Sequence, residues 1–168
     1  IPENVTSIGE AAFAACTGLT SLVIPDGITS ISNSLVNGCN GLASIHIPEG
    51  VISIDDYAFR YTALTSVELP ASLTSIGMFV FSDCNNLAEI KSKNPTPPEV
   101  SEFTFDDYHY ADCVLTVPEG SLDNYADAAV WCNFVNKNET DFSGVGEVSD
   151  SENTVSVVVD DGRIMIKG

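Results

Sequence analysis

The chain has 168 residues, of which 44% are hydrophobic, and a formal net charge of −18 from 24 acidic and 6 basic residues. This negative charge would repel phosphate backbones and anionic lipid head groups, so the composition argues against nucleic acids and membrane surfaces as partners. The sequence contains no apolar run long enough to cross a bilayer, so we expect no membrane insertion.

Residues 1–91 contain four copies of one sequence motif. It opens at Ile1-Pro2, Ile24-Pro25, Ile47-Pro48 and Leu69-Pro70, so successive copies start 23, 23 and 22 residues apart. A fixed period of this length is the signature of a solenoid, in which each short unit buries its apolar side against its neighbours. We therefore predict a single coil with a core stretched along its axis.

Within this repeat, the apolar places keep their residue type from unit to unit. Equivalent side chains should stack about 4.8 Å apart, as neighbouring strands do, and form continuous columns. The clearest columns are Ile8, Ile31, Ile54, Ile76 and, with one substitution, Phe13, Val36, Phe59, Phe81. In unit three, four residues rather than five separate Phe59 from Leu64, and Thr62 or Tyr61 replaces a cysteine, so we expect a tighter convex loop there.

One short strand is expected in each unit. In the first copy the apolar residues alternate around Leu22, and Pro25 then ends the strand because proline has no N–H to donate. These strands should lie parallel in one sheet, with loop or 3-10 structure on the convex side.

The solvent face of this sheet is the candidate partner-binding surface. The residue type at the last position of each strand varies from repeat to repeat, and the position two residues earlier is polar. Both features are expected for positions that face water. The candidate residues are Val23, His46, Glu68 and Lys91, with Ser44, Ser66, Glu89 and the equivalent Ser21. The alternative is that this face is only a solvated surface.

The repeat continues loosely after residue 91. Residues 94–98 form a proline-rich extended linker, and residues 103–112 are expected to be an insertion. Its Tyr108 and Tyr110 are candidate contact residues, unless these rings fold back onto the last coil. Residues 113–136 then predict a C-terminal cap, with Ser121 as the N-cap of a helix.

The tail differs in composition from the repeats. Residues 141–153 are polar and acidic and predict a linker, and Asp160-Asp161-Gly162 between two β-branched runs predicts a hairpin over residues 154–168. The predicted organisation is four repeats over 1–91, an atypical last repeat with insertion and cap over 92–140, the linker, and the hairpin.

No residue pattern supports catalysis, a cofactor or a metal. Cys16, Cys39 and Cys84 share one repeat position and should be free inward-facing thiols, whereas Cys113 and Cys132 are either free or paired. His109 and Cys113 lack the second ligand pair of a zinc site. The acidic residues of the insertion lack the spacing of known calcium loops, which favours a solvated loop over a calcium site; they are Glu102, Asp106, Asp107 and Asp112.

The repeat motif resembles the leucine-rich repeats of BspA-like bacterial surface proteins. The resemblance is clearest at residues 64–70, followed by Leu73 to Gly77 and Phe81 to Cys84. The resemblance implies a leucine-rich-repeat solenoid on a secreted or cell-surface protein that adheres to host proteins. The trailing hairpin weakly resembles the opening strands of small C-terminal β-domains on such proteins.

We therefore predict a non-catalytic, adhesin-like module that binds host or other extracellular proteins. One alternative is a structural stalk that presents another domain, and another is an enzyme that uses the acidic insertion. Because Ile1 opens in the middle of a repeat, we expect the chain to start within a longer array. Its N-terminal edge would then be able to pair with another chain.

Overall fold

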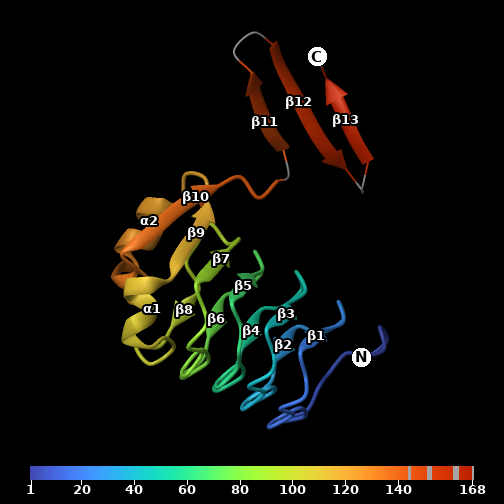
Figure 1. The fold of residues 1–168 in the computed structure, drawn as a ribbon, viewed down its shortest axis with the longest axis vertical. Helices are drawn as coiled ribbons and strands as arrows, with labels where there is room; N and C mark the ends of the chain where they lie inside the picture. Colours follow the sequence, from blue (N-terminus) through green and yellow to red (C-terminus); the bar gives the residue numbers. More distant parts are fainter. Residues whose placement is uncertain (144, 151–152, 161–162, 168) are drawn as a thin grey trace.

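The computed structural model describes residues 1–143, 145–150, 153–160 and 163–167. The repeats form a coil whose main strands lie parallel and side by side along the coil axis (Figure 1). Equivalent residues pair directly, for example Leu22 with Ile45 and Val67 with Ile90. These strands are β1 (Ser21–Val23), β3 (Ser44–His46), β5 (Ser66–Leu69), β7 (Glu89–Ser92), β9 (Val114–Pro118) and β10 (Asn136–Thr140).

Repeats two to four and the coil that follows them also contain a second, two-residue strand that the sequence analysis did not predict. These strands form a parallel sheet in the order β2 (Ser30–Ile31), β4 (Ser53–Ile54), β6 (Ser75–Ile76) and β8 (Glu99–Val100). Their isoleucines form the predicted column, because Ile31, Ile54 and Ile76 are stacked in register and no more than 3% exposed. An element of two residues is too short for an alternating pattern to reveal.

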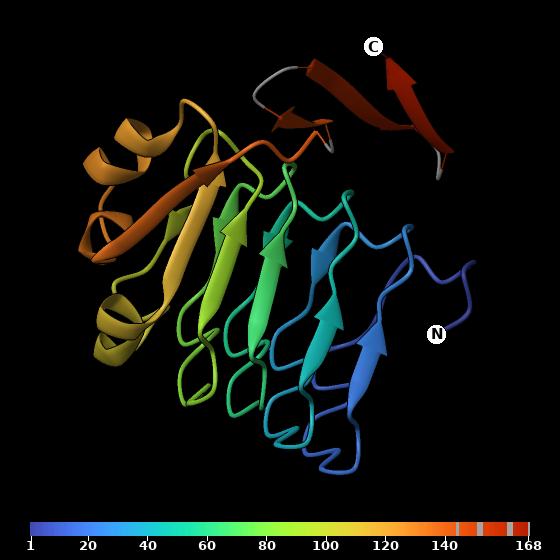
Figure 2. The same ribbon diagram turned by 45° about the horizontal axis from the view of Figure 1, so that its top comes forward.

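Turns join the second strand to the main strand within the same repeat (Figure 2). Their backbone amides also connect the coils: the N–H of Ser34 donates to the carbonyl of Asp56 at 3.0 Å, and that of Tyr57 to Met78 at 2.9 Å. Residues at these places have positive φ angles, 56° at Ser34, 60° at Tyr57 and 57° at Phe79. We call this side of the coil the turn edge.

The segment 92–112 is a fifth coil rather than a linker followed by an insertion. Val100 pairs with Ile76 and Leu115 with Ile90, so this coil exceeds a regular one by only one or two residues. Phe105 continues the aromatic column, because its ring stacks on Phe81 at 5.3 Å. Helix α1 (Asp107–Asp112) takes the place of the tight turn. The sequence analysis mistook this helix for an insertion because it replaces familiar turn residues.

The predicted cap closes the coil. It consists of α2 (Leu122–Asp127), which follows the N-cap Ser121, a 3-10 turn over Trp131–Asn133, and β10. Tyr125, Trp131 and Phe134 are at most 1% exposed and cover the last coil. The Trp131 Nε1–H donates to the carbonyl of Pro98 at 2.8 Å, so the cap is anchored to the fifth coil.

The C-terminal residues form an antiparallel sheet of β11 (Val145–Asp150), β12 (Asn153–Asp160) and β13 (Arg163–Lys167). Strands β12 and β13 are the predicted hairpin, in which Asp160 pairs with Arg163. The predicted turn residues 161 and 162 lie outside the described residues. The linker prediction was wrong for residues 145–150, which pair with β12.

All five cysteines are free thiols, so Cys113 and Cys132 do not pair. Cys39 and Cys84 are buried at their shared repeat position, and each thiol donates to a carbonyl of the preceding coil. Cys16, in the first coil, is exposed, contrary to the prediction. In unit three Thr62 takes the cysteine place and donates to the Phe59 carbonyl. Burial raises the pKa of Cys113 to about 11, which keeps this thiol protonated and unreactive.

Candidate binding surface

The predicted surface residues lie on one side of β1, β3, β5 and β7, which we call the sheet face. Its end positions are in register, Val23 beside His46 and Glu68 beside Lys91. Val23 is 60% exposed, and His46 and Glu68 are also exposed. The remaining members are Ser21, Ser44 and Ser66, which are exposed, and Glu89, which is half-buried like Lys91. The chemistry of this face therefore changes from apolar to anionic to cationic along the coil.

The main sheet is interrupted in the middle of the sheet face. In the described part of the chain, β1 and β3 form one ladder, and β5, β7, β9 and β10 form another. The Thr65 N–H reaches the Ala43 carbonyl only at 3.4 Å, whereas the equivalent Ala88-to-Thr65 bond measures 2.9 Å. The interruption coincides with the third unit, which has one residue fewer than its neighbours in the turn before β5.

A pocket of about 210 Å³ lies at this interruption, and we call it the break pocket. Apolar side chains from Val23, Ile45 and Pro70 line it together with the polar His46 and Glu68. Ile45 is only half-buried, although Leu22 and Val67, its neighbours in the column, are buried. The interruption thus exposes core side chains next to polar groups on an otherwise flat sheet.

An ion-pair cluster borders the break pocket. The Lys93 ammonium lies 2.7 Å from a Glu49 carboxylate oxygen and 2.8 Å from one of Glu68. Burial alone would raise the pKa of Glu49, but the hydrogen bonds from Lys93 and the Ala71 N–H lower it below its ordinary value. Burial alone would lower the pKa of Lys93, but its hydrogen bonds to Glu49 and Glu68 raise it above its ordinary value. Both partners are therefore charged at neutral pH.

Glu49 and Lys93 were missed by the sequence analysis. Each lies just beyond the end of a main strand, where the alternating pattern of the strand no longer applies. The Lys93–Glu49 pair joins residues 44 positions apart, so it exists only because three coils stack in register. The two residues are not at equivalent repeat positions, since Lys93 stands at the place of Pro70 and Glu49 at that of Ala71, so a comparison of equivalent positions would not have paired them.

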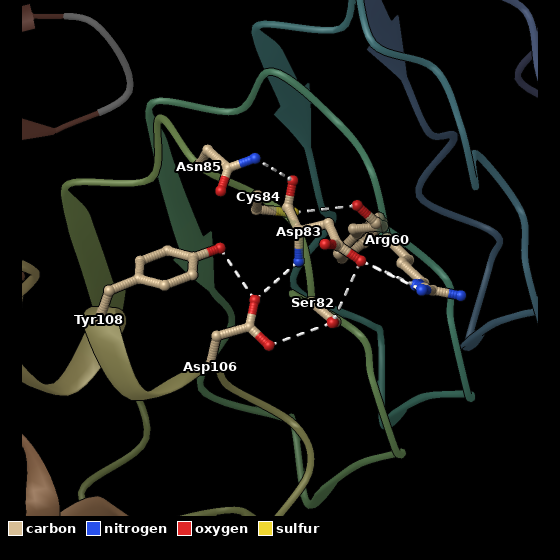
Figure 3. Close-up of polar contacts among 8 residues, drawn as sticks. Arg60, Ser82, Asp83, Cys84, Asn85, Asp106 and Tyr108 are labelled. Atoms are coloured by element: carbon tan, nitrogen blue, oxygen red, sulfur yellow. Dashed lines mark hydrogen bonds and ion pairs between the residues drawn. The ribbon is translucent and has the colours of Figure 1, made fainter.

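Tyr108 and Tyr110 do not belong to the sheet face, because both lie on α1 in the fifth coil. The Tyr110 ring packs edge-on against Phe105 and Phe134 at 6.2 and 5.2 Å, so it folds back onto the last coil. The Tyr108 hydroxyl donates to Asp106 Oδ2 at 2.8 Å (Figure 3). Burial and this bond raise the pKa of Tyr108 above its usual value.

His109 is a structural residue. It is completely buried, its Nδ1 accepts the Asp106 N–H at 3.1 Å, and its Nε2–H donates to the Cys84 carbonyl at 3.2 Å. These bonds fix the ring in the neutral form and leave no nitrogen for a metal or a nucleophile. Within the described residues, no group of three or more histidine, cysteine or acidic side chains is placed to hold a metal ion.

We expect His109 to make the protein less stable in acid. Burial lowers its pKa below the ordinary value, although the Cys84 carbonyl and Asp106 oppose this shift. As the pH falls through about 6.5 the unfolded chain binds this proton first, so stability present above that pH is lost below it. The urea midpoint of unfolding should therefore fall more between pH 8 and pH 5 in the natural protein than in His109→Gln. Parallel pH profiles would contradict this assignment.

The comparisons with known proteins agree on the repeat. The family described as BspA type Leucine rich repeat region matches residues 1–121 with six copies. No curated protein matches the chain. In the described part of the chain, no helix has the length and apolar character needed to cross a membrane.

Several solved structures share the fold. A leucine rich cell surface protein from Faecalibacterium prausnitzii is 36% identical, with a TM-score of 0.51, over 52% of this chain and 23% of its own. A leucine-rich repeat protein from Bacteroides ovatus is 23% identical, with a TM-score of 0.51, over 83% and 42% of the two chains. The pneumococcal vaccine antigen PcpA is 18% identical, with a TM-score of 0.51, over 83% and 40%.

This chain therefore spans less than half the length of these three proteins. The period of 22 to 23 residues, the stacked columns and the family match lead to the same assignment. The chain belongs to the BspA-type leucine-rich-repeat family.

Proposed function

We propose that this chain is a non-catalytic, adhesin-like module that binds host or other extracellular proteins at the cell surface. The observation that carries the proposal is the exposed sheet face. Its in-register side chains differ in charge and polarity from repeat to repeat, while the buried columns beneath them keep their residue type. A rigid parallel scaffold that presents variable side chains is the usual binding device of repeat proteins.

The break pocket gives this face an anchoring point. Val23 and the half-buried Ile45 offer apolar contact area, and Glu68 and Lys93 offer charges of both signs in the lining of the same pocket. A partner that inserts an apolar side chain here and pairs with the charges at the rim would have the apolar core and polar border of ordinary protein interfaces.

Two further observations support the proposed location and the proposed class of partner. The 36% identical Faecalibacterium prausnitzii protein is a cell surface protein, which supports the same placement for this chain. The charge of −18 suits proteins as partners better than nucleic acids or anionic lipids.

The combined substitution of His46, Glu68 and Lys91 by serine should abolish most binding to immobilised extracellular-matrix proteins. It removes one negative and one positive charge, so the formal net charge stays at −18 and a general charge effect is excluded. The free energy of unfolding should change by no more than about 1 kcal/mol, because the Glu68 and Lys91 ion pairs are half-exposed. Binding and urea denaturation are measured on the same preparations.

A control variant places serine at Ile52 and Glu99, two exposed positions beside or within the second sheet, and changes the formal net charge by only one unit. Binding should survive this change. Full binding by the sheet-face variant would instead favour a stalk that holds another domain away from the cell.

A further inference from the structure

A second surface lies on the turn edge, at the opposite end of the main strands from Lys93 and Pro70. Three aromatic rings stack there in a column, Tyr57 on Phe79 at 5.3 Å and Phe79 on Phe103 at 5.5 Å, with interplanar angles of 13° and 20°. Phe103 ends the column and is 49% exposed. A large aromatic side chain at the end of an ordered stack presents an uncovered ring to solvent.

A pocket of about 500 Å³ adjoins this ring, and we call it the turn-edge pocket. Its aromatic lining comes from Phe79, Phe103 and Tyr108. Its carboxylates come from Glu102, Asp106 and Asp107. Asp106 is held in place because it accepts bonds from the Asp83 N–H, the Ser82 hydroxyl and the Tyr108 hydroxyl (Figure 3). Glu102 is exposed and Asp107 is exposed, and neither forms an ion pair with a described residue.

The preceding coil holds a cation of its own against aromatic rings and a carboxylate. The Arg60 guanidinium lies over the Tyr61 ring at 4.8 Å and the Tyr57 ring at 5.8 Å. Its Nη2 and Nε are also 3.1 and 3.2 Å from Asp83 Oδ2 (Figure 3). A planar cation thus lies between aromatic rings and a carboxylate, an arrangement that suits guanidinium better than ammonium.

The next coil keeps one of these rings and a carboxylate but not the cation. Phe79 stands at the place of Tyr57, whereas Asp83 replaces Tyr61. The backbone bonds Gly38-to-Arg60 and Tyr61-to-Ser82 place Ser82 at the position of Arg60. Ser82 is uncharged and bonds to Asp106. The turn-edge pocket therefore combines aromatic rings with carboxylates, as the Arg60 site does, and none of its lining residues is an arginine.

We propose that the turn-edge pocket binds an arginine side chain from a basic segment of a partner protein. The guanidinium stacks on the open face of Phe103 and donates to Glu102 and Asp107. The excess of 24 acidic over 6 basic residues draws such a segment towards this chain. A metal ion fits the site poorly, because these carboxylates are not grouped as ligands in the described structure.

The test titrates the whole chain with three fluorescent peptides that alternate glycine with arginine, lysine or neutral citrulline. The arginine peptide should bind at least 5-fold more tightly than the lysine peptide, and the citrulline peptide should not bind. Phe103→Ala should weaken arginine-peptide binding by about 10-fold, in the range expected when a cation loses its aromatic face. Glu102→Gln with Asp107→Asn should weaken it by a similar factor.

The control variant, Glu3→Gln with Glu10→Gln, removes the same two negative charges at exposed places in the first coil. It should keep the affinity of the natural protein, as should the sheet-face variant. Equal binding of the arginine and lysine peptides, or equal losses in the control and pocket variants, would reduce the interaction to general charge attraction and overturn the proposal. Unchanged binding by Phe103→Ala would overturn it as well.

Discussion

Replacing Phe59 by alanine is expected to lower the free energy of unfolding by about 3–5 kcal/mol. Phe59 has no exposed surface, and its ring lies 5.8 Å from that of Phe81 in the aromatic column. The loss combines the transfer free energy of a buried aromatic side chain with the cost of the cavity that remains. Urea denaturation followed by circular dichroism measures it.

Phe59→Ala should also loosen the packing of the next coil. The Phe59 ring packs against Phe81 of the fourth coil, and alanine removes this contact between the two coils. Phe103→Ala is the matched control, because it removes an equal ring from a half-exposed place on the turn edge. It should cost about 1 kcal/mol or less. Equal losses in the two variants would mean that the columns are not the core.

The repeat explains why much of the fold was predictable. A column such as Ile31, Ile54 and Ile76 constrains residue type at every coil, because each member touches the one above and the one below. The sequence repeats that constraint at a fixed spacing, so the core and the parallel sheet could be predicted without any structure. The exposed places were predicted by the same comparison, since only they vary.

The features that escaped prediction depend on contacts that no repeat encodes. The break between β3 and β5 coincides with one missing residue in the turn before β5, but it appears at a strand edge rather than at the turn itself. The replacement of a turn by α1 depends on the burial of His109 against the Cys84 carbonyl. Both are departures from the repeat, and both lie beside a candidate binding pocket.

Replacing Trp131 by alanine should have the second large effect, again about 3–5 kcal/mol. The indole is 1% exposed, and its ring contacts Phe105 and Tyr125, each at a centroid distance of 5.4 Å. Its removal leaves a cavity between the cap and the fifth coil, and it leaves the Pro98 carbonyl without its Nε1–H donor. Circular dichroism in urea measures the loss, because the variant has no other tryptophan to report by fluorescence.

Trp131→Phe helps to separate these two contributions, because it keeps a six-membered aromatic ring and removes the pyrrole ring with its N–H donor. Its cost should be about 1–3 kcal/mol, the range for one buried acceptor left unsatisfied. A detached cap would expose apolar side chains such as Phe105 and Leu115, which are at most 4% exposed in the intact protein. Trp131→Ala should therefore bind a hydrophobic dye and scatter light at urea concentrations where Phe59→Ala, with its cap in place, does neither. Equal dye binding by the two variants would mean that the aromatic cap does not shield the end of the coil.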